Sequence, residues 1–138
     1  MAASKTIRNA EGIAEKLAGL AMNVAVECSP KYDLSDIVDP TIIIVPKDRV
    51  SEIETKEANK VEYFYEVGFL KKMGETDTVD VLLAVVEEIE DRLTRELVCG
   101  IYSCVEVDHT LLYSISALAN KRQFVSVMTV RLVGFERH

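Results

Sequence analysis

Two stretches of the chain repeat apolar side chains at steps of three and four residues, the spacing of an amphipathic helix. The first predicts an N-terminal helix over about Lys5–Met22. The second begins after Asp77 or Thr78, either of which can cap a helix, and its apolar stripe runs to Leu97, with Gly100 closing it. We therefore expect two long helices, each with one buried face.

Other stretches have the composition and alternation of β-strands. The run Thr41–Val45 is largely β-branched and follows a proline, which indicates a strand buried on both faces. The last run, Gln123–Phe135, is apolar on both faces, so we expect it to be central in a sheet or buried at an interface. The strands are expected at Val24–Cys28, Thr41–Val45, Val61–Leu70, Ile101–Asp108 and Gln123–Phe135.

Three segments lack a clear period. Lys31–Pro40 is expected to be a loop, Lys47–Lys60 is either an exposed strand pair or a mobile excursion, and Thr110–Asn120 is ambiguous between helix and loop. The order helix, strands, helix, strands predicts an α+β fold, a mostly antiparallel sheet with two long helices packed on one face. We expect residues 1–138 to form a single domain.

Charge is unevenly distributed along the chain. The net charge is -7 and the sequence pI is about 4.9, which argues against gripping nucleic acid through its phosphates. Residues 1–22 hold three basic and two acidic side chains and residues 121–138 hold four and one, so that 9 basic and 20 acidic residues are left for the middle. Opposite charges on different surfaces favour head-to-tail self-association, which can close a ring.

The candidate chemistry is limited to Cys99, Cys104 and His109, spaced by five residues. Together with Cys28 the chain has three cysteines. An odd number favours a protein that is kept in a reducing cytosol. Five-residue steps in a strand place successive side chains on opposite faces, so the three cannot reach one metal ion. His109, beside Asp108, is expected in a surface turn. We expect no catalytic residue, no metal site, no cofactor and no membrane span, with a small enzyme or binding protein using this region as the alternative.

Four stretches together resemble the tail-terminator or tail-completion proteins of tailed bacteriophages, which join tail to head. They are TIIIVPKDR (Thr41–Arg49), EYFYEVGFLKK (Glu62–Lys72), GETDTVDVLLAVVEEIEDRL (Gly74–Leu93) and LANKRQFVSVMTVRLVGF (Leu118–Phe135). The likeness is one of element order and residue class, and it covers most of the chain. It implies a small α+β virion protein with a structural role and no enzymatic one.

In such a protein the resemblance implies a homo-oligomeric ring, typically a hexamer, at the head-proximal end of the tail tube. The ring would stop tube polymerisation, bind the tail tube protein and the head connector or a neck protein, and let DNA pass without specific binding. It would be made in the host cytoplasm and end at the head–tail interface. Another neck or minor tail protein, or a generic bacterial oligomerisation module, would fit the same residues.

Two sets of site residues follow from this expectation. The loop Cys28–Pro40 and the segment Lys47–Lys60 lack the period to bury themselves, so we expect intersubunit or tail-facing contacts there. In the second segment these are Lys47, Arg49, Glu52, Glu54, Lys56 and Glu57. A wall around passing DNA must not bind phosphates, and its acidic candidates are Glu52, Glu54, Glu57, Glu87, Glu88 and Asp91. For the last three, simple solubility is an equal explanation.

Overall fold

The computed structural model describes residues 4–20, 23–26, 40–53, 58–74, 77–94, 97–98 and 102–137. Its helices are α1 (Lys5–Leu17), the short 3-10 helix η1 (Ala18–Leu20), α2 (Val79–Leu93) and α3 (Ile115–Lys121). Its strands are β1 (Asn23–Val26), β2 (Thr41–Ile53), β3 (Ala58–Lys72), β4 (Leu97–Val98), β5 (Tyr102–Leu111) and β6 (Gln123–Arg137). The loop expected at 31–39 and the contacts expected from it lie outside the described residues.

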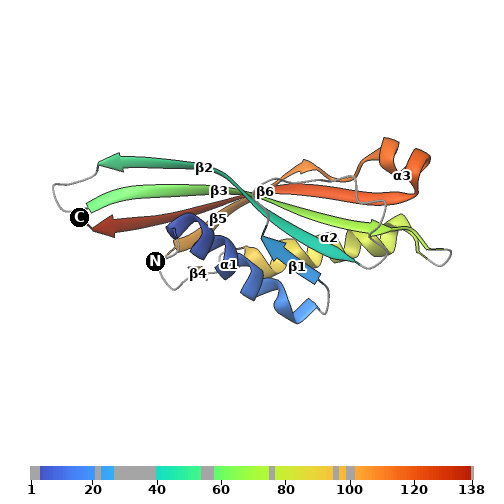
Figure 1. Cartoon of the computed structure of the whole chain (residues 1–138), viewed down its shortest axis with the longest axis horizontal. Helices are drawn as coiled ribbons and strands as arrows, with labels where there is room; N and C mark the ends of the chain where they lie inside the picture. The colour runs from blue at the N-terminus through green and yellow to red at the C-terminus, as the bar shows by residue number, and fades with distance from the viewer. Residues whose placement is uncertain are drawn as a thin grey trace.

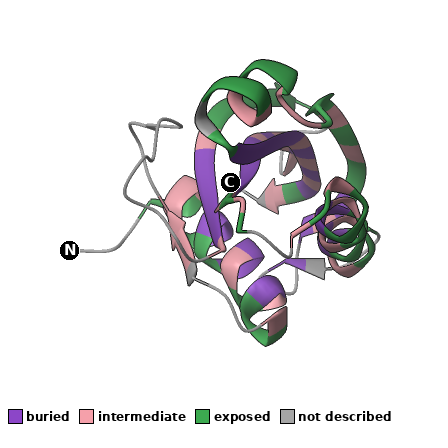
Figure 2. Ribbon diagram, turned by 90° about the vertical axis from the view of Figure 1, so that its right-hand side faces the viewer, coloured by how far each residue is buried: buried purple, intermediate pink, exposed green. Residues whose placement is uncertain are grey.

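The described strands form one sheet in the order β1-β2-β3-β6-β5-β4. Only β1 and β2 pair in parallel, and the other neighbours are antiparallel. Helices α1 and α2 lie on one face, where Ile13 and Ile89 join Tyr65 and Leu132 in the main core (Figure 1). The α+β prediction is confirmed, and β6 is central, as its two apolar faces indicated. Figure 2 shows exposed residues on the outer sides of the helices and also along parts of the strands.

The helices begin at side-chain caps but end earlier than the apolar stripes indicated. Ser4 caps α1, and the Thr78 hydroxyl accepts a hydrogen bond from the Val81 N–H at the start of α2. The prediction that the second helix continues to Leu97 is wrong. Thr94 leaves the helical conformation with ψ 123°, and its N–H and hydroxyl both donate to the Glu90 carbonyl. Leu97 belongs to β4 instead, and α1 ends at Leu17 before the η1 turn.

The polar segment Lys47–Lys60 is an exposed strand pair in its described part, the first of the two alternatives. Strands β2 and β3 stay paired as far as Ile53 opposite Asn59, with a bulge between Pro46 and Asp48. Residues 41–45 of β2 are buried, as expected, whereas residues 47–53 are exposed. Because β1 pairs only with residues 41–44 of β2, the distal parts of β2, β3 and β6 form an arm (Figure 1).

The ambiguous segment divides into the end of β5, the cap Ser114 and the short helix α3. Ala117 of α3 packs on a smaller apolar cluster that includes Ile43 and Val127, on the sheet face opposite α1 and α2. Arg122, which follows α3, has φ 51° and is in the left-handed region. Across the described ranges, no helix has the length and apolar character needed to cross a membrane.

Candidate functional site

The distal end of the arm exposes large apolar side chains. We call this surface the hairpin end and define it as Val50–Ile53 of β2, Ala58–Lys60 of β3 and Phe135 of β6. Ile53 is 80% exposed, Phe135 61% and Val50 42%. On the sheet face away from α1 and α2, Glu52, Lys60 and Phe135 are cross-strand neighbours. Val50 and Phe135 share this face, whereas Ile53, opposite Asn59, lies on the other face. Exposed apolar side chains at a protruding end of a protein are typical of protein contacts.

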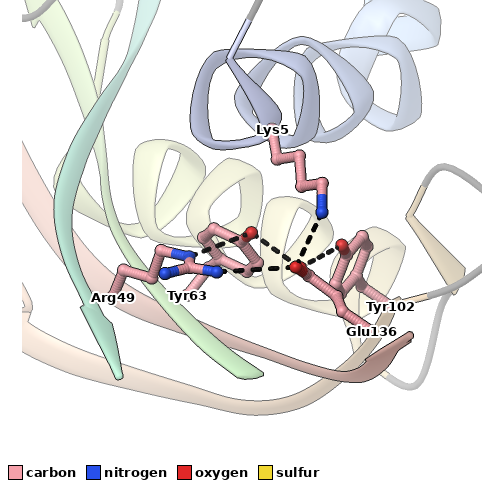
Figure 3. Close-up of polar contacts among 5 residues, drawn as sticks. All are labelled: Lys5, Arg49, Tyr63, Tyr102 and Glu136. Carbon is pink, nitrogen blue, oxygen red and sulfur yellow. Dashed lines mark hydrogen bonds and ion pairs between the residues drawn. The ribbon is translucent and has the colours of Figure 1, made fainter. Parts of the chain in front are cut away.

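A cluster of polar side chains centred on Glu136 lies on the other face of the same arm (Figure 3). The Tyr102 hydroxyl donates to Glu136 Oε2 at 2.5 Å, and the Tyr63 hydroxyl donates to the same oxygen at 2.8 Å. Lys5 Nζ lies 2.9 Å and Arg49 Nη2 3.4 Å from Oε1. The five residues come from α1, β2, β3, β5 and β6. We call this group the Glu136 cluster.

The Glu136 cluster holds an ionised carboxylate. Its side chain is only 11% exposed, and burial by itself would raise its pKa. The hydrogen bonds from Tyr102, Lys5 and Tyr63 outweigh burial and lower the pKa of Glu136 to about 2. Burial and the hydrogen bond to Glu136 raise the pKa of Tyr102. Neither group is therefore suited to exchange protons near neutral pH, and the cluster fixes elements rather than performing acid–base chemistry.

Two close approaches complete the cluster. The Arg49 guanidinium donates from Nε to the Tyr63 hydroxyl at 3.2 Å, and its Cζ lies 5.5 Å from the centroid of the Tyr63 ring. The Tyr102 ring lies against the backbone of Gly134, where a Cβ would come within 2.5 Å of Tyr102 Cδ1. These contacts tie the start of α1 and the edge of β5 to the arm, so the cluster sets the direction in which the hairpin end projects.

The residues expected at intersubunit or tail-facing contacts lie in different surroundings in the structure. Lys47, at the β2 bulge, pairs with Glu66 across the strands at 3.2 Å. Arg49 belongs to the Glu136 cluster, and Glu52 is exposed at the hairpin end. Glu54, Lys56 and Glu57 lie outside the described residues.

Of the acidic residues expected at the DNA path, those that the structure describes lie on two separate elements. Glu87, Glu88 and Asp91 are exposed on α2, where Glu88 also pairs with Arg92 at 3.1 Å. Glu52 is on the distal part of β2. Figure 1 shows that the distal end of β2 lies well away from α2. The structure therefore does not bring Glu52 together with Glu87, Glu88 and Asp91 within one chain.

The cysteine and histidine region differs from its expected geometry. A bulge between Cys104 and Glu106 changes the phase of β5, so that Cys104 and His109 face the same side, opposite Leu132 and Met128 of β6. The premise of opposite faces is wrong for this pair. The spacing along the strand, about 13 Å for four residues of β6, still separates them.

His109 also lies in β5 and not in a turn, with Nε2 3.3 Å from Glu90 Oε1. Cys104 is 2% exposed, and burial raises its pKa to about 11, which disfavours the nucleophilic thiolate. Within the described ranges, no three His, Cys, Asp or Glu side chains are grouped as a metal site would require. Cys99 lies outside these ranges.

Sequence reasoning did not find the Glu136 cluster. Its members are separated by up to 131 positions, and each one is an ordinary residue type for its own strand or helix. The local signal in β3 was the alternation that places Tyr63 on the buried face of that strand.

The fold is similar to that of a known terminator. It superposes on the sheath/tube terminator of an extracellular contractile injection system, PVC, in its extended state, with a TM-score of 0.51 and 11% identity. The match covers 100% of this chain and 60% of that chain, so this chain spans less than two thirds of the other's length. A second solved structure superposes with a TM-score of 0.48 and 13% identity, over 100% of this chain and 97% of the other.

No protein-family model matches the chain, and no curated protein matches it by sequence. At these identities the comparison shows the fold alone, which is terminator-like.

Proposed function

We propose that this protein is a structural component that terminates the tube of a phage tail or of a phage-tail-like particle. It acts as a homo-oligomeric ring at one end of the tube and stops further addition of tube subunits. The observation that carries the proposal is that the whole chain shares its fold with a sheath/tube terminator. Fold likeness does not transfer function by itself, so the proposal also needs a surface suited to assembly.

The hairpin end supplies that surface. Ile53, Phe135 and Val50 are exposed on an arm that the Glu136 cluster holds against α1 and β5. A fixed arm loses little conformational freedom on binding, which favours association. Lys47, Arg49 and Glu52 on the same arm add polar groups at the rim of such a contact.

The partners follow from the position of a terminator. One face of the ring binds the tail tube protein and, in a phage, the other binds the head connector or a neck protein. The ring is a hexamer, as the likeness to phage terminators implies, and it lies at the head–tail interface of the virion after assembly in the host cytoplasm. DNA passes through it without specific binding, past the acidic face of α2 that carries Glu87, Glu88 and Asp91.

The test has two steps. Light scattering coupled to size-exclusion chromatography, followed by electron microscopy, should find rings of one defined mass. Deletion of the gene in a strain that makes the particle should then give tubes of uncontrolled length, and expression of the gene in trans should restore one length. Unchanged tube length after deletion would refute tube termination, and a protein that stays monomeric at high concentration would refute the ring.

A further inference from the structure

The sheet has an open edge on each side in the part of the chain that the structure describes. Strand β1 pairs only with Thr41–Ile44 of β2, and residues 47–53 of β2 are exposed. On the opposite side, β4 pairs only with Tyr102 and Ser103 of β5, and most of β5 beyond Cys104 is exposed. An open edge carries backbone N–H and C=O groups with which another strand can pair.

The two edges match in direction, so that two copies of the chain could pair through them. Strands β3 and β6 lie between β2 and β5, and each neighbouring pair of these four strands is antiparallel. Strands β2 and β5 therefore run in opposite directions. A second copy, rotated about an axis along the strands, would place its β2 beside β5 of the first copy in antiparallel orientation. Backbone direction alone thus permits the sheet to extend from copy to copy.

Both edges, however, carry acidic side chains on the same face of the sheet, the face away from α1 and α2. These are Asp48 and Glu52 in β2 and Glu106 and Asp108 in β5. Side chains that face each other in an antiparallel pair share one face, and the rotation keeps the faces of both copies in line. Pairing would therefore bring the carboxylates of one copy next to those of the other, and like charges across a strand pair are destabilising.

Basic side chains near the β5 edge do not cancel this charge. Arg131 contacts Glu106 at 3.2 Å but also contacts Glu62 at 3.3 Å, so one guanidinium is shared by two carboxylates. Asp108 lies opposite Thr129, which carries no charge. The β5 edge therefore keeps a net negative charge on this face.

The same holds at the β2 edge. Lys60 lies across from Glu52, but its Nζ contacts Glu62 at 3.7 Å. Lys47 contacts Glu66 at 3.2 Å. The cations beside the β2 edge are thus shared with carboxylates of β3.

The backbone of both edges is interrupted as well. Strand β2 has a bulge between Pro46 and Asp48, and β5 has one on each side of the stretch Glu106–His109. Bulges and charged side chains are the two means by which natural sheets limit pairing at an open edge. The two means occur together on both open edges of this sheet.

We infer that Asp48, Glu52, Glu106 and Asp108 form a charge barrier that keeps copies of this chain from pairing edge to edge. The inference goes beyond the proposed function. It confines contacts between copies to side-chain surfaces such as the hairpin end, and it excludes growth of the sheet by strand addition. The barrier is a property of each copy, so it is tested separately from the ring.

Asp108→Lys tests the barrier because it replaces repulsion by attraction. The lysine would face Asp48 and Glu52 of a second copy. Light scattering coupled to size-exclusion chromatography should show species larger than those of the natural chain, with a half-association concentration at least about tenfold lower. High salt should weaken this association, because it screens the attraction. Glu15→Lys, the same reversal at an exposed position of α1, is the matched control and should behave like the natural chain.

Hydrogen–deuterium exchange locates the contact. In associated Asp108→Lys, the backbone amides of residues 48–53 and 106–109 should exchange more slowly than in the natural chain. Adding Asp48→Lys and Glu52→Lys to Asp108→Lys restores like charge across the two edges. The triple variant should therefore lose the added association and the slower exchange. Circular dichroism checks that each variant is folded, and Asp108→Asn, which only removes one charge, should shift association in the same direction by a smaller factor.

The outcomes separate this inference from the proposed function. If Asp108→Lys associates no more than Glu15→Lys, the barrier is refuted. If Asp108→Lys associates without slower exchange at the two edges, or if the triple variant associates as strongly, the contact lies elsewhere and the inference is also overturned. If the natural chain forms no ring, the proposed ring is refuted, whereas the comparison of these variants with the natural chain still decides whether the barrier exists.

Discussion

Replacing Glu136 with glutamine tests whether an ionised carboxylate holds the arm in place. Glutamine keeps the size of the side chain and one acceptor oxygen but removes the charge that Lys5 and Arg49 contact at 2.9 and 3.4 Å. A pKa lowered from 4.5 to about 2 corresponds to at most about 3 kcal/mol of folding free energy. Because Lys5 is 58% and Arg49 46% exposed, we expect about 2 kcal/mol at pH 7.

The pH dependence has a defined direction. The folded-state pKa of Glu136 is lowered, so its stabilisation is fully present above the ordinary pKa of 4.5 and is lost as the pH falls through 4.5 towards 2. The difference in stability between the natural chain and Glu136→Gln should therefore be constant from pH 7 to pH 5. By pH 3 it should have fallen by more than half.

Urea denaturation followed by circular dichroism measures both quantities. With a slope of about 2 kcal/mol per molar urea, the expected loss moves the midpoint by about 1 M at pH 7. Glu11→Gln, an exposed carboxylate on α1, is the control and should change stability by less than about 0.5 kcal/mol. An equal midpoint for Glu136→Gln and the natural chain at pH 7, or a difference that does not change between pH 7 and pH 3, would refute the role assigned to this carboxylate.

Three further predictions concern other parts of the molecule. Gly134→Ala should destabilise the fold by about 1–3 kcal/mol in thermal unfolding, because its Cβ would lie 2.5 Å from the Tyr102 ring, and an unchanged melting temperature would contradict this packing. Cys104 should react with iodoacetamide at pH 8 only after unfolding, as peptide mass spectrometry can measure, since it is buried with a pKa of about 11; fast labelling of the folded protein would contradict it. Reversing Glu87 and Asp91 to lysine should slow genome ejection in a salt-dependent way with tails still joined, and unchanged ejection would remove α2 from the DNA path.

Local sequence patterns predicted the secondary structure correctly where one continuous face of an element, or an unbroken apolar run, is buried. The apolar stripe of α2 and its Thr78 cap depend on residues within one turn of each other, so the sequence contains the whole signal. The burial of residues 41–45 in β2 likewise follows from an unbroken apolar run. The end of α2 was missed because Leu97 continues the same stripe in β4, and periodicity alone does not separate the two elements.

Features that depend on pairing between strands could not be predicted from local patterns in the sequence. Residues 47–53 of β2 are polar and exposed, so neither alternation nor an apolar run distinguishes a strand pair from a mobile excursion. The bulge beside Cys104 is visible only in the register with β6, and it reverses the facing of His109. One inserted residue changes the face of every residue that follows it in the strand.

The sequence by itself determined the α+β class, the two long helices and the strands with a continuous buried face, because each follows from a repeat of apolar side chains within a short segment. Only the tertiary structure decided which chemistry those elements bring together. Lys5 meets Glu136 across 131 positions, and His109 of β5 meets Glu90 of α2. The physical reason is that an apolar repeat shows which face of a segment is buried. Which other segments pack against that face depends on the packing of the whole chain.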